Sequence, residues 1–250
     1  MKYFLLLLVM LSFLSGCHIN LTFKTSSIFV ERNNTKIESK GILQVKTTKT
    51  IKTTFKSFFK TDIIKDPLSD IEVESTVEIG GSCVVVSFID GWYYAATAKH
   101  VVMFGQKIFV DNNESEIVYK SDVADIALLK FKSNKRYFIH NMGEATLGDI
   151  SWSIGFPADV IGKSRKFVVR GAICYIGKNE VWTNGGGHKG MSGGALLNSK
   201  NEVIGVISRF MYSYPYNTSF ICCIPIKEIR QKIEIIKIRS KIRNFFKIKT

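Results

Sequence analysis

The sequence lacks the residue spacings that usually hold a metal ion. Its 250 residues include five cysteines and four histidines, but no Cys-x-x-Cys or His-x-x-x-His pair occurs. Such short spacings bring ligands together in most structural zinc sites. Their absence argues against a structural metal, and we expect no metal site in this protein.

A convincing helical period is also absent between residues 80 and 224. Short runs rich in Val, Ile, Tyr and Phe alternate there with Gly, Asn, Asp and Ser. This pattern is typical of many short strands joined by turns, and Asp90-Gly91 and Asn201-Glu202 are typical hairpin turns. The predicted strands span residues 82–89, 92–97, 107–110, 115–120, 126–131, 152–156, 166–177, 180–183, 194–198, 202–210 and 219–224. The pattern excludes a helical body and predicts an all-β one.

This β-rich body has little excess charge of either sign. The formal net charge of +14 is distributed unevenly: residues 76–225 carry 15 basic and 12 acidic side chains, whereas residues 226–250 carry 9 and 2. Half of the excess therefore lies in the last 25 residues. Because nucleic acids are bound through strongly basic surfaces, we expect no nucleic-acid partner for the body.

The N-terminus has the features of a targeting segment. Lys2 precedes the short apolar run 3–11, as in a secretory signal, and this run is short for a membrane-spanning helix. The segment ends in Leu14-Ser15-Gly16-Cys17, which resembles the bacterial lipoprotein box, in which the cysteine is lipidated. The alternative is an ordinary cleaved signal with a chance cysteine. Both exclude residues 1–17 from the fold and predict export, either as a membrane-anchored lipoprotein at the cell envelope or as a secreted protein.

The segment from residue 18 to 75 is polar and shows no persistent period. Its Lys/Thr-rich stretch 46–54 follows neither a helical nor a strand pattern over its length. We therefore predict a polar tether, with one or two loose strands at most.

The last part of the chain changes to a helical period. After Pro225, the residues Ile226, Ile229, Ile233 and Ile236 recur at steps of three and four, as on one face of a helix. Residues 236–250 form a basic tail that contains Phe245-Phe246. This tail is either a solvated helix end or a basic amphipathic segment on a membrane surface.

A serine between glycines is the strongest candidate for a reactive group. In Gly190-Met191-Ser192-Gly193-Gly194 the small neighbours leave room for a substrate, and the amides of Gly190 and Ser192 can point at one developing oxyanion. A serine hydroxyl needs a base and a group that orients the base. His100 follows one strand-like apolar run, and Asp125 precedes another.

With these motifs the chain resembles the trypsin-like (chymotrypsin-fold) serine proteases, in particular HtrA-like and short bacterial trypsin-like peptidases. The resemblance covers roughly residues 76–235. It implies two packed six-stranded antiparallel β-barrels with a C-terminal helix, the first barrel ending at about residue 145. The matching segments are Thr97-Ala98-Lys99-His100-Val101, Asp125-Ile126-Ala127-Leu128-Leu129, Ile154-Gly155-Phe156-Pro157, Gly190-Met191-Ser192-Gly193-Gly194 and Glu202-Val203-Ile204-Gly205-Val206.

The resemblance implies a serine endopeptidase that acts on polypeptides through an acyl-enzyme and needs no cofactor. Ser192 is the expected nucleophile, His100 the general base and then acid, and Asp125 the group that holds the imidazole. Gly190 and Ser192 would supply the oxyanion-hole amides. Asp122 is a rival carboxylate, but Asp125 directly precedes the apolar run, as in the family motif.

The resemblance also implies residues that contact the substrate. Gly186 is expected at the floor of the specificity pocket, His188 at its wall, and Ser208 on a strand that pairs with the bound peptide. No acidic residue occurs between Asn184 and Met191, so the acidic floor that selects Lys or Arg is absent. We therefore expect a preference for small or medium apolar side chains.

Two other functional classes fit the sequence less well than a peptidase does. A catalytically inactive protease fold, kept as a binding module at the cell envelope, is disfavoured by the intact His, Asp and Ser set. An esterase would be expected to show Gly-x-Ser-x-Gly and the order Ser, Asp, His.

The four cysteines after Cys17 permit three full disulfide pairings. Because the body is large enough not to need disulfides, we expect buried free thiols.

Overall fold

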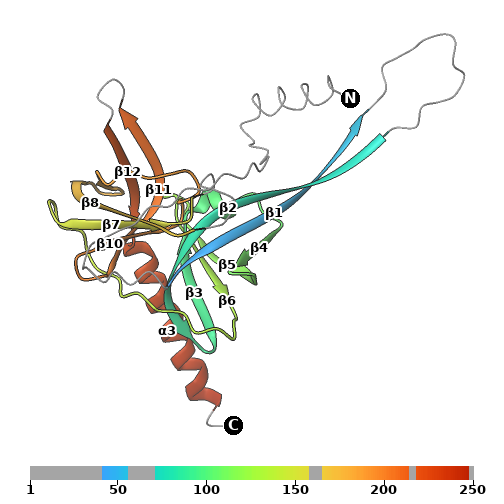
Figure 1. The fold of residues 1–250 in the computed structure, drawn as a ribbon. Coiled ribbons are helices and arrows are strands. Elements are labelled where there is room, and N and C mark those ends of the chain that lie inside the picture. Colours follow the sequence, from blue (N-terminus) through green and yellow to red (C-terminus); the bar gives the residue numbers. More distant parts are fainter. Residues whose placement is uncertain (1–40, 56–70, 158–164, 214–217, 248–250) are drawn as a thin grey trace, which may run out of the picture.

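A computed structural model describes residues 41–55, 71–157, 165–213 and 218–247. These residues form two closed antiparallel β-barrels of six strands each, followed by a helix (Figure 1). The first barrel has the order β1 (Ile42–Phe55), β2 (Ile71–Ile89), β3 (Trp92–Thr97), β6 (Ala127–Phe131), β5 (Asn113–Lys120) and β4 (Lys107–Val110). The second has the order β10 (Ala195–Asn198), β11 (Val203–Ser213), β12 (Thr218–Pro225), β9 (Val181–Thr183), β8 (Phe167–Ile176) and β7 (Ile150–Gly155). The predicted architecture is confirmed.

The first barrel begins earlier in the chain than the sequence pattern indicated. β1 lies inside the range 18–75 that was predicted as a tether, and it pairs with β2 from Ile42↔Val84 to Phe55↔Ile71. Ile42, Val45 and Thr47 are buried. The many Lys and Thr residues hide this strand in the sequence, although β-branched Thr suits a strand well. Residues 18–40 and 56–70, like the signal segment with Cys17, lie outside the described residues.

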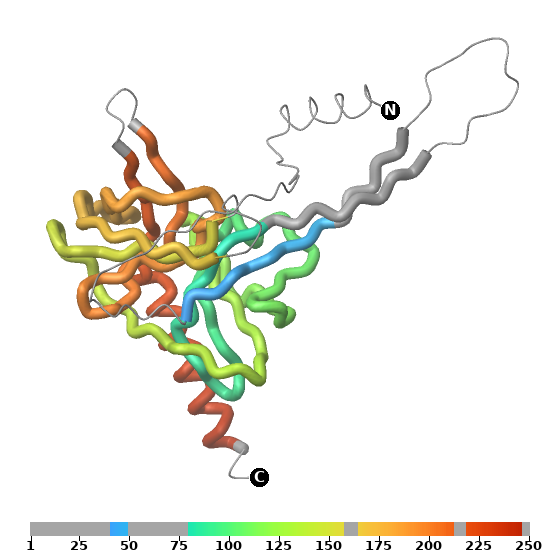
Figure 2. Tube along the Cα trace, viewed as in Figure 1, coloured from blue at the N-terminus to red at the C-terminus, as the bar shows by residue number. Residues whose placement is uncertain are grey.

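Three clusters of buried side chains form the core. One fills the first barrel and a second fills the second barrel. The third joins the barrels, because it combines Leu128 and Tyr94 of the first barrel with Ile154 and Leu197 of the second. Figure 2 shows the first barrel, in blue and green, beside the second, in yellow and orange. Since each buried aliphatic side chain contributes about 1.5–3 kcal/mol, this shared layer holds the two barrels in one relative position.

The helix α3 (Lys227–Lys247) follows Pro225, as predicted. Its residues Ile229 and Ile233 are buried in the layer between the barrels. The helix continues through the range predicted as a separate basic tail. Among the described residues, no helix is long and apolar enough to cross a membrane.

The turn between β2 and β3 meets this helix. Asp90 and Gly91 have φ angles of 51° and 79°, the left-handed conformations of a tight hairpin turn, as predicted. The Ser240 hydroxyl donates to the Asp90 carboxylate at 2.8 Å. This contact attaches the second half of α3 to the first barrel.

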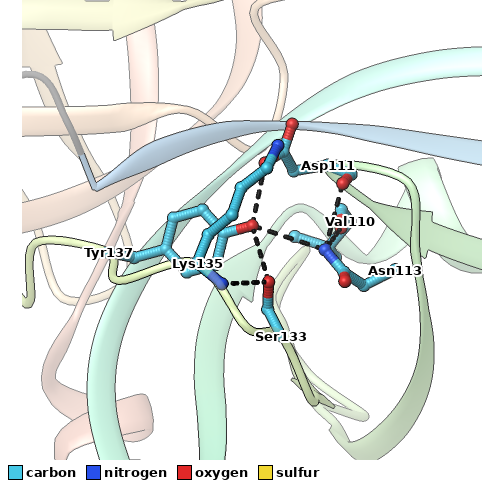
Figure 3. A network of polar contacts seen from close by, with 6 residues as sticks. All are labelled: Val110, Asp111, Asn113, Ser133, Lys135 and Tyr137. Carbon is cyan, nitrogen blue, oxygen red and sulfur yellow. Dashed lines mark hydrogen bonds and ion pairs between the residues drawn. The ribbon is translucent and has the colours of Figure 1, made fainter.

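A polar network ties the segment that leaves the first barrel to the β4–β5 turn (Figure 3). The Asp111 carboxylate accepts hydrogen bonds from the Tyr137 hydroxyl at 2.8 Å and from Lys135 Nζ at 3.0 Å. The Tyr137 hydroxyl also lies 3.3 Å from Nδ2 of Asn113 and 3.2 Å from Oγ of Ser133. These contacts anchor the connection toward the second barrel.

All four described cysteines are free. Cys83, Cys222 and Cys223 are buried, whereas Cys174 is exposed. Burial raises the pKa of the Cys222 thiol to about 11, so the thiol stays protonated at neutral pH. The expected buried free thiols are confirmed at three positions, and Cys174 is the exception.

Candidate active site

A single helical turn presents His100. β3 ends at Thr97, and α2 (Lys99–Val102) follows, with Val101 and Val102 buried and the His100 side chain exposed. The His100 amide donates to Oδ1 of Asp125 at 2.9 Å, and Nδ1 of its ring lies 2.7 Å from Oδ2. Two contacts to one carboxylate fix both the backbone and the ring of His100. Four residues are too few to give a helical period, so the sequence pattern did not show this turn.

The structure distinguishes Asp125 from its rival Asp122. The loop before β6 is held by Ser121, whose hydroxyl accepts the amides of Val123 at 3.3 Å and Ala124 at 3.1 Å. Asp122 is exposed on this loop, whereas Asp125 is the carboxylate in contact with His100.

Partial burial raises the pKa of the Asp125 carboxyl, but hydrogen bonds from the His100 side chain, the Ser208 hydroxyl and the His100 amide outweigh that effect. The resulting pKa is about 2. Asp125 is therefore ionised at neutral pH. A carboxylate at Nδ1 favours the tautomer with the proton on Nδ1, which leaves Nε2 of His100 as the basic nitrogen.

The loop before β10 carries Ser192. Gly190 and Gly193 have φ angles of 88° and 85°, which favour glycine, and a Cβ atom at Gly193 would overlap the carbonyl oxygen of Ser82. The Met191 amide donates to the His188 carbonyl at 3.2 Å, and the Gly193 amide donates to the Ile207 carbonyl at 2.7 Å.

The amides of Gly190 and Ser192 alternate with these two bonded amides along the chain. Neither donates to an acceptor within the part of the chain that the structure describes. They are the two amides that the sequence predicted for the oxyanion hole.

Ser82 of the first barrel is hydrogen-bonded to the loop that carries Ser192. Its amide donates to the Ser192 carbonyl at 2.8 Å, and its hydroxyl donates to the Gly190 carbonyl at 3.2 Å. The same hydroxyl accepts the Phe156 amide at 2.8 Å, and the Ser82 carbonyl accepts from Thr97 Oγ1 at 2.7 Å. The sequence pattern did not point to Ser82, because a serine in a strand carries no signal of a contact 108 residues away in the chain.

Ser208 contacts two of the three predicted catalytic residues, Asp125 and Ser192. Its hydroxyl donates to Oδ2 of Asp125 at 2.6 Å, and its carbonyl accepts the Ser192 hydroxyl at 3.2 Å. No hydrogen bond joins Ser192 to His100 within the described ranges. Ser208 is the extra residue where the β11–β12 register shifts between Ile207 and Arg209. Its side chain was not predicted to bond Asp125.

Of the residues predicted to contact substrate, Gly186 and His188 lie on the loop before Ser192, whereas Ser208 lies on β11. Gly186 has a φ of 72° and faces the Ser219 hydroxyl, and the exposed His188 packs against Phe167 with ring centroids 5.5 Å apart. A Cβ atom at Gly187 would overlap the Phe210 ring. Bulk from β11 therefore fills the space beside this loop.

No group of three or more His, Cys, Asp or Glu side chains that is suited to a metal ion occurs among the residues that the structure describes.

Comparison with known proteins gives consistent matches. The profile of the trypsin-like peptidase domain matches residues 81–206, half of the chain. The serine endoprotease DegS of Haemophilus influenzae is 33% identical over 143 residues, covering 50% of this chain and 40% of DegS. The periplasmic pH-dependent serine endoprotease DegQ of Escherichia coli is 28% identical over 166 residues, covering 61% of this chain and 34% of DegQ. This chain thus spans well under half the length of both relatives.

Solved structures show the same fold. The HtrA-type protease AlgW with a decapeptide superposes with a TM-score of 0.57 at 23% identity, covering 80% of this chain and 66% of AlgW. The serine endoprotease from Yersinia pestis gives a TM-score of 0.56 at 22% identity, covering 80% of this chain and 63% of the other. The profile match over half of the chain shows that the chain belongs to the trypsin-like peptidase family, and its sequence is similar to those of the DegS and DegQ serine endoproteases.

Proposed function

We propose that this protein is a serine endopeptidase with Ser192 as nucleophile, His100 as general base and Asp125 as the carboxylate that orients His100. The observation that carries the proposal is the 2.7 Å contact between His100 and Asp125, together with the attachment of Asp125 and Ser192 to the same residue, Ser208.

The reaction requires one rearrangement of Ser192. Its hydroxyl, which donates to the Ser208 carbonyl, rotates toward Nε2 of His100 when substrate binds. Nε2 takes the hydroxyl proton while Oγ attacks the scissile carbonyl. The oxyanion that forms accepts the amides of Gly190 and Ser192, which are available for this role.

The second half of the reaction uses the same groups. The imidazolium gives its proton to the leaving amine, and the acyl-enzyme on Ser192 remains. Water then attacks the acyl group and gives a proton to His100, the bond between the acyl group and Oγ of Ser192 breaks, and His100 returns the proton to Oγ. Asp125 stabilises the imidazolium electrostatically, because its lowered pKa keeps it ionised throughout.

The proposed substrate is an extended polypeptide. Ser208 interrupts the pairing of β11 with β12, so its backbone is placed where a peptide strand can add. The absence of acidic residues between Asn184 and Met191 and the bulk of Phe210 against Gly187 support a preference for small or medium apolar side chains.

The proposed location is outside the cytoplasm. The relative DegQ is named a periplasmic protease, and the N-terminal sequence has the pattern of an export signal. We propose that Cys17 is lipidated and anchors the protein at the envelope. Mass spectrometry of the mature N-terminus decides between this and simple secretion: an unmodified terminus other than Cys17 rules out the anchor.

Labelling with a fluorophosphonate probe tests the catalytic proposal. We expect the wild-type protein to be labelled and to cleave casein, whereas Ser192→Ala does neither and remains folded. His100→Ala is expected to lose labelling as well. A folded wild type that neither reacts with the probe nor cleaves casein refutes the peptidase and supports the inactive binding module.

A further inference from the structure

The second half of α3 carries an exposed apolar stripe. Ile235, Ile238, Ile242 and Phe245 recur at steps of three, four and three residues, which places them on one face of the helix. Their side chains are 44–56% exposed, and the neighbouring Phe246 is 64% exposed. Figure 1 shows that α3 continues past the barrels toward the C-terminus. Five large apolar side chains are therefore exposed on a short stretch of helix, whereas exposed apolar residues of a soluble protein are usually scattered singly.

The opposite face of the same helix is attached to the body. Ile229 and Ile233 are buried, and Ser240 is buried and donates to Asp90. Nη2 of Arg243 lies 2.9 Å from the same carboxylate, and Nδ2 of Asn244 lies 3.3 Å from it. These contacts fix the rotation of α3 about its axis, so the apolar stripe is held outward and cannot turn toward the barrels.

Basic residues border the stripe on both sides. At about 100° per residue, Arg239 and Arg243 follow one edge, and Lys237 and Lys241 follow the other. No acidic residue occurs between Ile235 and Lys247. Arg243 pairs with Asp90, and Lys237 pairs with Glu234 at 2.7 Å. The exposed Arg239 and Lys241 complete the basic border.

We propose that this face of α3 docks on an anionic phospholipid bilayer. The helix lies in the plane of the interface, with the Ile and Phe side chains at the boundary of the acyl chains and the basic side chains among the lipid phosphates. The charges select this occupant: a second copy would bring two basic borders together, and a nucleic acid would leave the apolar stripe unused. The proposal does not depend on catalysis, so its test is separate from that of the proposed peptidase.

A tryptophan introduced in place of Phe246 reports docking directly. We would prepare the full chain with Phe246→Trp and mix it with vesicles of phosphatidylcholine with brominated acyl chains and 30% phosphatidylglycerol. Docking is expected to shift the added emission to the blue and to quench it, relative to wild type with its three native tryptophans. A matched Leu147→Trp variant places the reporter at an exposed apolar position outside α3, and its emission is expected to change little. Because the readout is local, binding by the N-terminal segment cannot imitate it.

Two double variants in the Phe246→Trp background separate the contribution of apolar area to membrane binding from that of positive charge. Ile238→Gln with Ile242→Gln removes apolar area and is expected to abolish quenching, whereas Leu147→Gln is the matched apolar-to-polar control. Arg239→Gln with Lys241→Gln is expected to weaken binding of the reporter by about fivefold per charge at low salt. Gln is chosen because it is a good helix former.

The proposal is overturned if the tryptophan of the Phe246→Trp variant is not quenched, if neutral vesicles quench it as strongly as anionic ones, or if both double variants retain full quenching. A blue shift that grows with protein concentration in the absence of vesicles overturns it in favour of self-association.

Discussion

The hydroxyl of Ser208, on the second barrel, donates to Oδ2 of Asp125, on the first barrel, at 2.6 Å. The same oxygen lies 2.7 Å from Nδ1 of His100. The carbonyl of Ser208 accepts the hydroxyl of Ser192. Ser208 therefore holds the Asp125 carboxylate of the first barrel and the Ser192 hydroxyl of the second barrel in a fixed relative position.

Removal of this hydroxyl is predicted to cost stability as well as activity. Ser208→Ala leaves the Asp125 carboxylate with one donor fewer, and a hydrogen bond to a charged group contributes about 1.5–3 kcal/mol. We expect urea unfolding at pH 7 to show a loss in that range, with a lower kcat on peptides. Ser208→Thr keeps the hydroxyl and is the control. Equal unfolding free energies for wild type and Ser208→Ala would contradict the prediction.

Asp125 is predicted to make stability depend on pH in the acid range. Its folded-state pKa of about 2 lies below the ordinary value of 3.8, so the unfolded chain binds the proton more readily. Its contribution is fully present above pH 3.8 and is lost as the pH falls through about 2. We expect the unfolding free energy of wild type to fall relative to that of Asp125→Asn across this window. A constant difference between the two proteins from pH 5 to pH 2 would count against it.

Ser82 is predicted to position the Ser192 loop without contacting substrate. Ser82→Ala removes the bond to the Gly190 carbonyl and leaves the Phe156 amide without its acceptor. We expect kcat to fall by about tenfold with little change in KM, because the amides of the proposed oxyanion hole lose their support. Ser153→Ala is the matched control, since the buried Ser153 hydroxyl has no hydrogen-bond partner among the described residues. An equal effect of the two substitutions on kcat would refute the positioning role.

Gly193 is predicted to be intolerant of any side chain. Gly193→Ala places a Cβ atom on the Ser82 carbonyl and also strains a φ of 85°, whereas Gly91→Ala strains a φ of 79° with no atom within 4 Å. The strain costs about 1 kcal/mol in both proteins, so Gly91→Ala measures the strain alone. We expect Gly193→Ala to lower the unfolding free energy by at least about 2 kcal/mol more than Gly91→Ala does, and to abolish fluorophosphonate labelling. Comparable losses would mean that the loop yields to the added methyl group.

The sequence by itself determined the features that depend on local pattern. Apolar runs with turn residues between them predicted nearly all the strands, the isoleucine period after Pro225 predicted α3, and the motifs around His100, Asp125 and Ser192 predicted the family. β1 was not predicted, because its Lys and Thr residues show no apolar alternation and its burial depends on pairing with β2. The sequence left open whether the residues after Ile236 are a helix end or a separate basic segment, because the contact of Ser240 with Asp90 joins residues 150 positions apart in the chain.

Only the tertiary structure decided how the site is connected. The hydrogen bonds of Ser82 to the Ser192 loop and the hydrogen bond of Ser208 to Asp125 join residues of different barrels. The physical reason is that the identity of a serine or of a backbone amide in the sequence does not indicate which group it will hydrogen-bond. Its partner is whichever group barrel closure and packing bring within about 3 Å of it.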